Sequence, residues 1–204
     1  ERPKLLDAKP LEEITRLIER DEGMSITRSF IEEISSSNRS VLRIAGESGL
    51  GVSRFLQEVS KVARLSGFGV FTLHGSSALE KRKYSVLVNT LLENSLIDIQ
   101  DIDRLIYSQN WLDQLNAIIA HWLDVKGYSG LVIILENILK IDRSSLDNIK
   151  ACFYSSLNAP IGLVYADSGI QAQQLFPYGV TPKAIVYLHP ISPAGMKIWL
   201  TQLL

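Results

Sequence analysis

The feature that most constrains the fold is a short apolar run that leads directly into a glycine-rich loop. Residues 41–45 read VLRIA, residues 46–53 read GESGLGVS, and an amphipathic segment follows in which apolar side chains recur every three or four residues. A short apolar run predicts a buried strand, and that recurrence predicts a helix. Gly67 stands where the helix should end, because glycine readily adopts the left-handed conformation of a helix C-cap. The predicted local structure is strand, loop, helix.

Four more apolar runs, rich in β-branched residues, predict four further strands. They read GVFTL (69–73), LVIIL (131–135), IGLVY (161–165) and AIVYL (184–188). All four are apolar throughout and lack the alternation of a strand that has one face in solvent. Strands buried on both faces are typical of a parallel sheet covered by helices. The sequence therefore predicts an α/β fold of three layers, with a mostly parallel five-stranded sheet between helices.

Apolar residues at helical spacing predict helices around these strands. The ranges are 11–20 and 25–34 before the first strand, then 84–92 and 111–126. Residues 168–183 are rich first in glutamine and then in proline and glycine, which predicts an exposed loop beside the sheet.

The composition excludes several classes of function. With 21 basic and 22 acidic residues the net charge is -1, so no overall positive field attracts nucleic acid or an anionic membrane. The one cysteine, Cys152, can form neither an internal disulfide nor a thiolate metal cluster, which fits a reducing compartment. No stretch reaches the roughly 18–20 apolar residues that a membrane span needs. We expect a cytoplasmic protein without direct contact to nucleic acid or membrane.

The order of these patterns predicts three parts. We expect residues 1–40 to be a helical lead-in, residues 41–190 to form the α/β core, and residues 191–204 to begin a further helical lid or linker. The chain lacks an initiator methionine, and its last periodic segment, GMKIWLTQLL, stops without a glycine or proline to end a helix. These features suggest a piece of a longer protein with neighbouring domains.

The glycine-rich loop matches most of the phosphate-binding P-loop pattern, G-x-x-x-x-G-K-[ST]. Gly46, Gly51 and Ser53 are in register, Gly49 adds a further flexible position, and Val52 stands in the place of the lysine. In this motif the backbone N–H groups and the start of the following helix hold the phosphates. The lysine adds a charge-assisted contact worth about 1.5–3 kcal/mol. We therefore predict a degenerate phosphate loop whose nucleotide affinity is reduced tenfold to a hundredfold or more.

Two arginines near the loop are long enough to replace the missing cation. Arg54 follows the loop on the first turn of the helix, where arginine also suits the helix surface. Arg43 lies within the first predicted strand, and a buried arginine needs a carboxylate partner or an edge position.

These motifs resemble the signal-transducing ATPase domains of the STAND group, within the wider AAA-like P-loop family of bacterial regulators and kinase-linked receptors. Members carry a V-G-R-E-x-E stretch about two dozen residues before the P-loop, and residues 18–22 (IERDE) keep its arginine and acidic tail. The family segment L-x-P-L-S is matched by residues 188–192 (LHPIS). The resemblance covers nearly the whole chain and implies a three-layer P-loop NTPase-like fold.

The resemblance also locates the Walker B motif, for which the family typically has D-D-L-x-W-A-D-x-x-S. This chain reads ENILKIDRSS from Glu136, which keeps the spacing of Asp142 and Ser145. Glu136 stands where the family has the aspartate that helps hold Mg²⁺, so Ser53 and Glu136 are the candidate metal ligands. Asn137 takes the catalytic acidic position, and a neutral amide cannot accept the proton of an attacking water. General-base catalysis commonly contributes about 10²–10⁴-fold, so hydrolysis should be close to absent.

A third departure follows the fourth predicted strand. There the family tends to place a hydroxyl and an arginine, whereas this chain has Ala166, Asp167 and Ser168. The missing lysine, base and sensor arginine together predict a P-loop fold without ATP turnover.

Three functional hypotheses follow from the resemblance and these departures. The leading hypothesis is a catalytically inactive pseudo-ATPase of STAND type, without a cofactor, that regulates or binds a protein partner or a second copy within a larger signalling protein. The second is a switch that still binds ATP or ADP with Mg²⁺ at low affinity and hydrolyses little. The third is the ATPase-like module of a transcription regulator whose DNA-binding domain lies elsewhere.

Other reactive or charged residues have simpler explanations. The three histidines, at positions 74, 121 and 189, lack the spacing of a metal site. Residues 80–83 (EKRK) are most often a solvated loop in such a context; the alternative is a docking site for an acidic partner.

Overall fold

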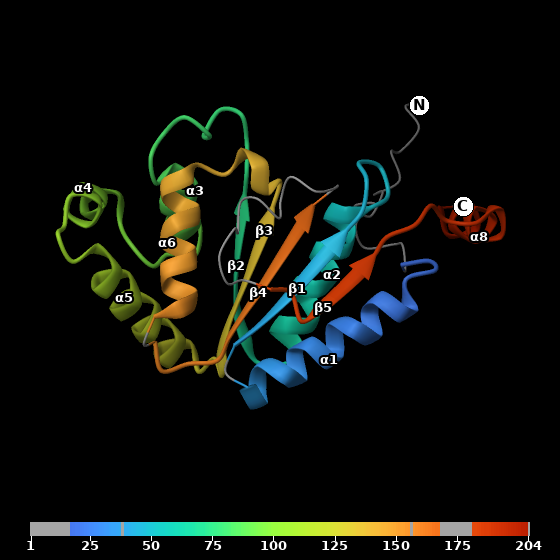
Figure 1. Ribbon diagram of the computed structural model, residues 1–204, viewed down its shortest axis with the longest axis horizontal. Helices are drawn as coiled ribbons and strands as arrows, with labels where there is room; N and C mark the ends of the chain where they lie inside the picture. The colour runs from blue at the N-terminus through green and yellow to red at the C-terminus, as the bar shows by residue number, and fades with distance from the viewer. Residues whose placement is uncertain (1–16, 38, 156, 168–180, 204) are drawn as a thin grey trace, which may run out of the picture.

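The computed structural model describes residues 17–37, 39–155, 157–167 and 181–203 of the chain. Its centre is one sheet of five strands in the order β2-β3-β4-β1-β5, in which every pair of neighbours is parallel (Figure 1). The strands are β1 (Arg39–Ala45), β2 (Phe68–His74), β3 (Gly130–Glu136), β4 (Ile161–Asp167) and β5 (Ala184–Tyr187). The five apolar runs thus form the predicted strands, and the predicted fold class is confirmed.

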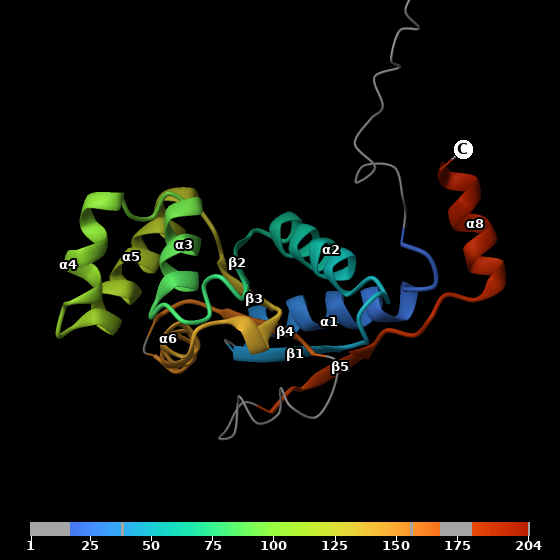
Figure 2. The ribbon, with the colours of Figure 1, turned by 90° about the horizontal axis from the view of Figure 1, so that it is seen from above.

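Helices cover both faces of the sheet (Figure 2). Buried side chains of α1 and α2 pack on one face, and those of α3, α5 and α6 pack on the other. The helices are α1 (Asp21–Ser37), α2 (Val52–Leu65), α3 (Ser85–Glu93), α4 (Ile102–Ile106), α5 (Trp111–Lys126), α6 (Arg143–Tyr154) and α8 (Pro193–Leu203), with short 3-10 turns η2 (Ile99–Asp101) and η3 (Ile138–Lys140). Among the described residues, no helix is long and apolar enough to cross a lipid bilayer.

The strands supply side chains to two separate apolar cores. Along β3, Ile133 faces the core beneath α3, α5 and α6, whereas Ile134 faces the core beneath α1 and α2. Both side chains are almost fully buried, as are the remaining apolar residues of that strand. This two-sided burial explains why the strands read as continuous apolar runs.

The first helix belongs to the same core as the sheet. Phe30 and Ile34 of α1 pack over β4 at Gly162. Glycine is needed there, because a Cβ atom at this position would collide with Ile34. The domain boundaries of the sequence analysis stay predictions, but α1 is not separated from the α/β core by a gap in packing.

The helix predicted over residues 11–20 is only partly open to comparison. Residues 11–16 lie outside the described residues, and residues 17–20 form no helix. Glu19 has a φ of 55°, which a right-handed helix does not allow. Helix α1 starts directly afterwards at Asp21 and is longer than the predicted range 25–34. Most of the predicted loop at 168–183 also lies outside the described residues.

Asp142 joins two helices through its carboxylate. It is 2% exposed and accepts hydrogen bonds from Ser145 N (2.9 Å) and Ser145 Oγ (2.6 Å), which cap the start of α6. It also accepts from Tyr84 N (2.8 Å) and Val86 N (3.2 Å) at the start of α3. A buried carboxylate is tolerated here because N–H donors and two helix N-termini stabilise its charge. The spacing of Asp142 and Ser145 therefore has a structural role in this chain, because it places the cap of α6.

We predict that Asp142→Ala lowers the free energy of unfolding by about 3 kcal/mol, because it removes two helix caps and leaves buried N–H groups without acceptors. Urea denaturation followed by circular dichroism measures the change. Asp147→Ala is the matched control on α6: its exposed pair with Arg143 predicts a loss of about 0.5 kcal/mol or less. Equal losses for the two variants would contradict the role of Asp142.

Candidate phosphate-binding site

The loop between β1 and α2 has the backbone of a phosphate loop. Gly49 and Gly51 have φ values of 90° and 83°, in the left-handed region that glycine reaches without a steric cost. The Gly46 N–H donates to the Asp167 carbonyl oxygen (3.0 Å), and the Leu50 N–H donates to that of Glu47 (3.2 Å). These bonds fix the loop at the carboxyl end of the sheet, where ligands of open α/β sheets bind.

Several N–H groups of this loop are available to an anion. Within the described part of the chain, the N–H groups of Gly49, Gly51, Val52 and Ser53 have no hydrogen-bond acceptor. Gly51 is the N-cap of the 14-residue helix α2 and carries no side chain that could satisfy them. Unpaired N–H groups and the positive end of a helix together favour an anion. The start of α2 therefore offers backbone donors of the kind that bind anions.

Val52 changes the character of the loop. Its side chain is half-buried and belongs to the apolar core under α1 and α2. A Cβ atom on Gly46 would lie 3.2 Å from Val52 Cγ2 and 3.1 Å from Leu188 Cβ. The valine therefore packs over the first glycine of the loop, where it offers an apolar contact and no positive charge.

The two arginines beside the loop are engaged elsewhere. Arg54 contacts Gln57 (3.2 Å) and Glu58 (3.0 Å), so its guanidinium lies along the surface of α2 in the direction away from the loop. Ser53, between Val52 and Arg54, is exposed.

Arg43 has the carboxylate partner that its buried position requires. Its guanidinium donates two hydrogen bonds to Asp167, of 2.9 Å and 2.8 Å, and the side chains are 12% and 3% exposed. These hydrogen bonds are the main reason why the pKa of Arg43 is raised. The pair links β1 to β4, and Asp167 also accepts the Gly46 N–H through its carbonyl. A carboxylate held by arginine thus occupies the position where the family tends to place its sensor residues.

The Walker B positions lie at the same edge of the sheet as the loop. Glu136 ends β3, and Oε2 of its carboxylate is 2.8 Å from Nδ1 of His74, the last residue of β2. Asn137 follows with a φ of 52°, which asparagine adopts more easily than most residues. Because β4 separates β1 from β3, Asp167 lies between the loop and Glu136 along this edge. The sequence did not predict the contact between His74 and Glu136, because that contact depends on β2 and β3 being neighbours in the sheet.

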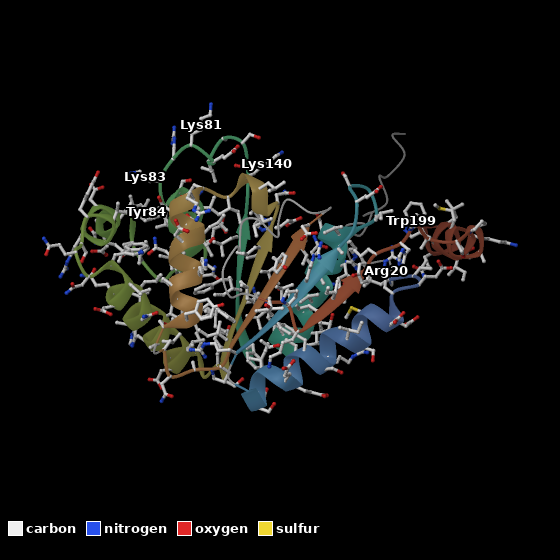
Figure 3. All side chains as sticks on the ribbon, viewed as in Figure 1. Arg20, Lys81, Lys83, Tyr84, Lys140 and Trp199 are labelled. Carbon is white, nitrogen blue, oxygen red and sulfur yellow. The ribbon has the colours of Figure 1, made fainter. Side chains whose placement is uncertain are left out.

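The remnant of the V-G-R-E stretch connects the loop to the end of β5. Arg20 donates from its guanidinium to the carbonyl oxygens of Leu50 (3.2 Å) and His189 (2.8 Å), and it lies at the start of α1 (Figure 3). Glu19 accepts from Ser192 N (2.7 Å) and from the Ser192 hydroxyl. The hydrogen bond from that hydroxyl is the largest cause of the lowered pKa of Glu19. The two family-like segments, 18–22 and 188–192, therefore meet beside the loop.

A pocket of about 240 Å³ adjoins this junction between α1 and β5, and it is lined by Arg20, Gly23, Ile26, Tyr187 and His189 among others.

No cluster of three or more metal-ligating side chains is found among the described residues. Burial raises the pKa of the Cys152 thiol to about 11, so this cysteine is not a nucleophile at neutral pH.

Solved structures similar to this chain show its fold. A structure of Drosophila ORC bound to DNA matches with 16% identity and a TM-score of 0.57, over 88% of this chain and 45% of that chain. Structures of Drosophila ORC bound to AT-rich DNA and Cdc6, and to GC-rich DNA and Cdc6, each match with 17% identity and a TM-score of 0.54. They cover 89% of this chain and 30% and 31% of those chains.

This chain thus spans less than half of each of these structures. At such identities the likeness concerns the fold alone, which is a P-loop, AAA-like α/β fold. No family model matches the sequence, and no curated protein matches it.

We predict that Arg43→Met lowers the free energy of unfolding by about 3 kcal/mol, because the buried Asp167 carboxylate loses two hydrogen bonds and the positive charge of Arg43. The double variant Arg43→Met/Asp167→Asn should recover at least half of that loss, since no buried charge remains. Urea denaturation measures both, with Arg143→Met as a control from an exposed ion pair. If Arg43→Met and Arg143→Met lose the same stability, Asp167 does not depend on Arg43.

Proposed function

We propose that this chain is a P-loop, AAA-like module of STAND type that does not turn over ATP, and that it serves as a regulatory or protein-interaction module of a larger signalling protein. The observation that carries the proposal is the position of Val52, which packs over Gly46 and belongs to the apolar core, where an active loop has its phosphate-binding lysine. An apolar side chain there cannot stabilise the charge that accumulates on a transferred phosphoryl group.

The surroundings of the loop support the same conclusion. Phosphoryl transfer depends on positioned positive charge and on a group that orients the nucleophile. Arg43 is neutralised by Asp167, and Arg54 is held by Glu58. Asn137 provides a neutral amide at the end of β3. The contacts described for both cations are therefore with carboxylates of this chain.

The interaction role is supported by α8, which follows the junction of residues 188–192. This helix exposes four large apolar side chains to solvent: Met196, Ile198, Trp199 and Leu200. Such a group of exposed apolar residues marks a contact with another protein or domain more often than a free surface. We assign it to a neighbouring domain or a partner protein.

The second candidate is a nucleotide-binding switch, and the unpaired N–H groups of the loop favour it. They fit a phosphate group without any side chain, as backbone nests do. Ser53 and Glu136 would hold a Mg²⁺ ion, which would neutralise phosphate charge when bound. The third candidate is a module of a transcription regulator, and its support is that the similar ORC structures contain DNA. The net charge of -1 does not favour binding of DNA by this chain.

We expect no measurable ATP turnover by the wild-type chain and no heat of binding up to about millimolar nucleotide in calorimetric titration with ATP and Mg²⁺ or with ADP. Val52→Lys should tighten nucleotide binding tenfold to a hundredfold, because it restores a charge-assisted contact. Turnover should stay absent in that variant, since Asn137 is unchanged. Leu65→Lys adds the same charge at the other end of α2, where the side chain is 88% exposed, and should change nothing.

The outcomes separate the candidates. Micromolar affinity of the wild-type chain without turnover would replace the leading proposal with the nucleotide-binding switch. Steady ATP hydrolysis by the wild-type chain would overturn both.

A further inference from the structure

The loop between β2 and α3 presents a basic patch that the proposed site does not use. The patch consists of Lys81, Arg82 and Lys83 on this loop and Lys140 on η3, and all four residues are exposed. Glu80 precedes them as the one acidic neighbour in the loop sequence. None of the four cations forms an ion pair with any described residue. Figure 3 shows Lys81, Lys83 and Lys140 pointing away from the sheet at one end of the molecule.

The backbone of this patch is held firmly. Glu80 N and Leu79 N both donate to the Ser76 carbonyl oxygen (3.0 Å each), and the Ser85 hydroxyl donates to that of Leu79 (2.8 Å). The two parts of the patch are joined through the buried Asp142, which accepts from Tyr84 N and follows Lys140 by two residues. The cations therefore project from an ordered surface, which reduces the entropy that a partner must remove on binding.

An acidic patch lies on the next segment of the chain. Asp98, Asp101 and Asp103 are exposed on η2 and α4, and none of them forms an ion pair with a described residue. Arg104 is exposed beside them, so the segment 98–104 keeps a net negative charge of two. The rings of Tyr84 and Trp111, whose centroids are 5.3 Å apart, join the end of the basic loop to the start of α5, the helix that follows the acidic segment.

Both patches also expose large apolar side chains. Leu139 beside Lys140 is 49% exposed, and Ile99 and Tyr107, at the two ends of the η2–α4 segment, are 79% and 82% exposed. Apolar residues surrounded by charges of one sign suit a protein surface of the opposite sign that also has apolar residues. The basic patch has no exposed aromatic ring for base stacking, because Tyr84 is half-buried against Trp111.

We propose that this face binds a second copy of the chain, with the basic patch of each copy on the acidic patch of the other. Two copies related by a two-fold axis would make this contact twice. The basic patch of the first copy would lie on the acidic patch of the second, and the acidic patch of the first on the basic patch of the second. This contact is separate from the P-loop, so it forms without nucleotide and does not depend on the proposed function. The partner is a second copy because one chain carries both halves of the contact.

The test is sedimentation velocity on the chain at increasing protein concentration. Self-association should weaken at least tenfold when NaCl is raised from about 50 mM to about 500 mM, because the screening length falls to a few ångströms. Adding ATP and Mg²⁺ should leave it unchanged. Lys81→Glu/Lys83→Glu and Asp98→Lys/Asp101→Lys should each weaken it at least tenfold. Asp98 and Asp101 make no side-chain cap bonds at η2 and α4, so their substitution spares both turns.

The decisive experiment mixes the two charge-reversed variants. Reversed patches repel in each variant alone but are complementary between the variants, so the mixture should associate as strongly as the wild-type chain. Arg28→Glu/Lys126→Glu changes the same number of exposed charges on α1 and α5 and should have no effect. The proposal is overturned if the wild-type chain is a monomer at low salt, or if mixing restores nothing. A third outcome is a monomeric wild-type chain that binds a DNA duplex, with binding abolished by Lys81→Glu/Lys83→Glu. That outcome would overturn the proposal and assign the basic patch to nucleic acid.

Discussion

The burial of the parallel sheet on both faces determines where this protein can bind a ligand. Side chains of β3 are enclosed between two helical layers, so the strand interiors have no room for polar chemistry. Parallel strands all end at one edge, and the polar residues Asp167 and Glu136 stand at the ends of β4 and β3 on that edge. The loop after β1 opens at the same edge. The location of the candidate site thus follows from strand direction and burial, before any particular side chain is considered.

At this edge, three charged side chains are engaged within the chain. Arg43 is held by Asp167, Glu136 is in contact with His74, and Arg20 donates to two backbone carbonyls. Each contact stabilises the fold but removes a charge that an active site would direct at a phosphate. The loop after β1 offers backbone N–H groups, which bind anions with modest strength and do not discriminate between reaction states.

The sequence predicted the strands well because their burial is a local property. Residues 131–135 are apolar at every position, and only a strand buried on both faces explains such a run at this length. The partner of Arg43 could not be predicted in the same way, since Asp167 lies 124 residues further along the chain and becomes adjacent only through the order of the strands. The sequence indicates Asp142 through its spacing to Ser145. The hydrogen bonds of Asp142 to the start of α3 could not be predicted, because they depend on the packing of α3 against α6. The helix predicted near Glu19 failed because a tertiary contact with Ser192 prevailed over local periodicity.

The contacts of Glu19 and Arg20 give the loop a mechanical link to α8. Arg20 bonds the carbonyl of Leu50 within the loop, and the adjacent Glu19 bonds Ser192, one residue before the helix begins. The two residues are consecutive, so one short stretch of backbone contacts both the loop and the residue before α8. These contacts need neither a lysine nor a catalytic base, because they are hydrogen bonds to backbone groups and to the Ser192 hydroxyl. The connection between loop and helix is therefore independent of the side chains that ATP hydrolysis requires.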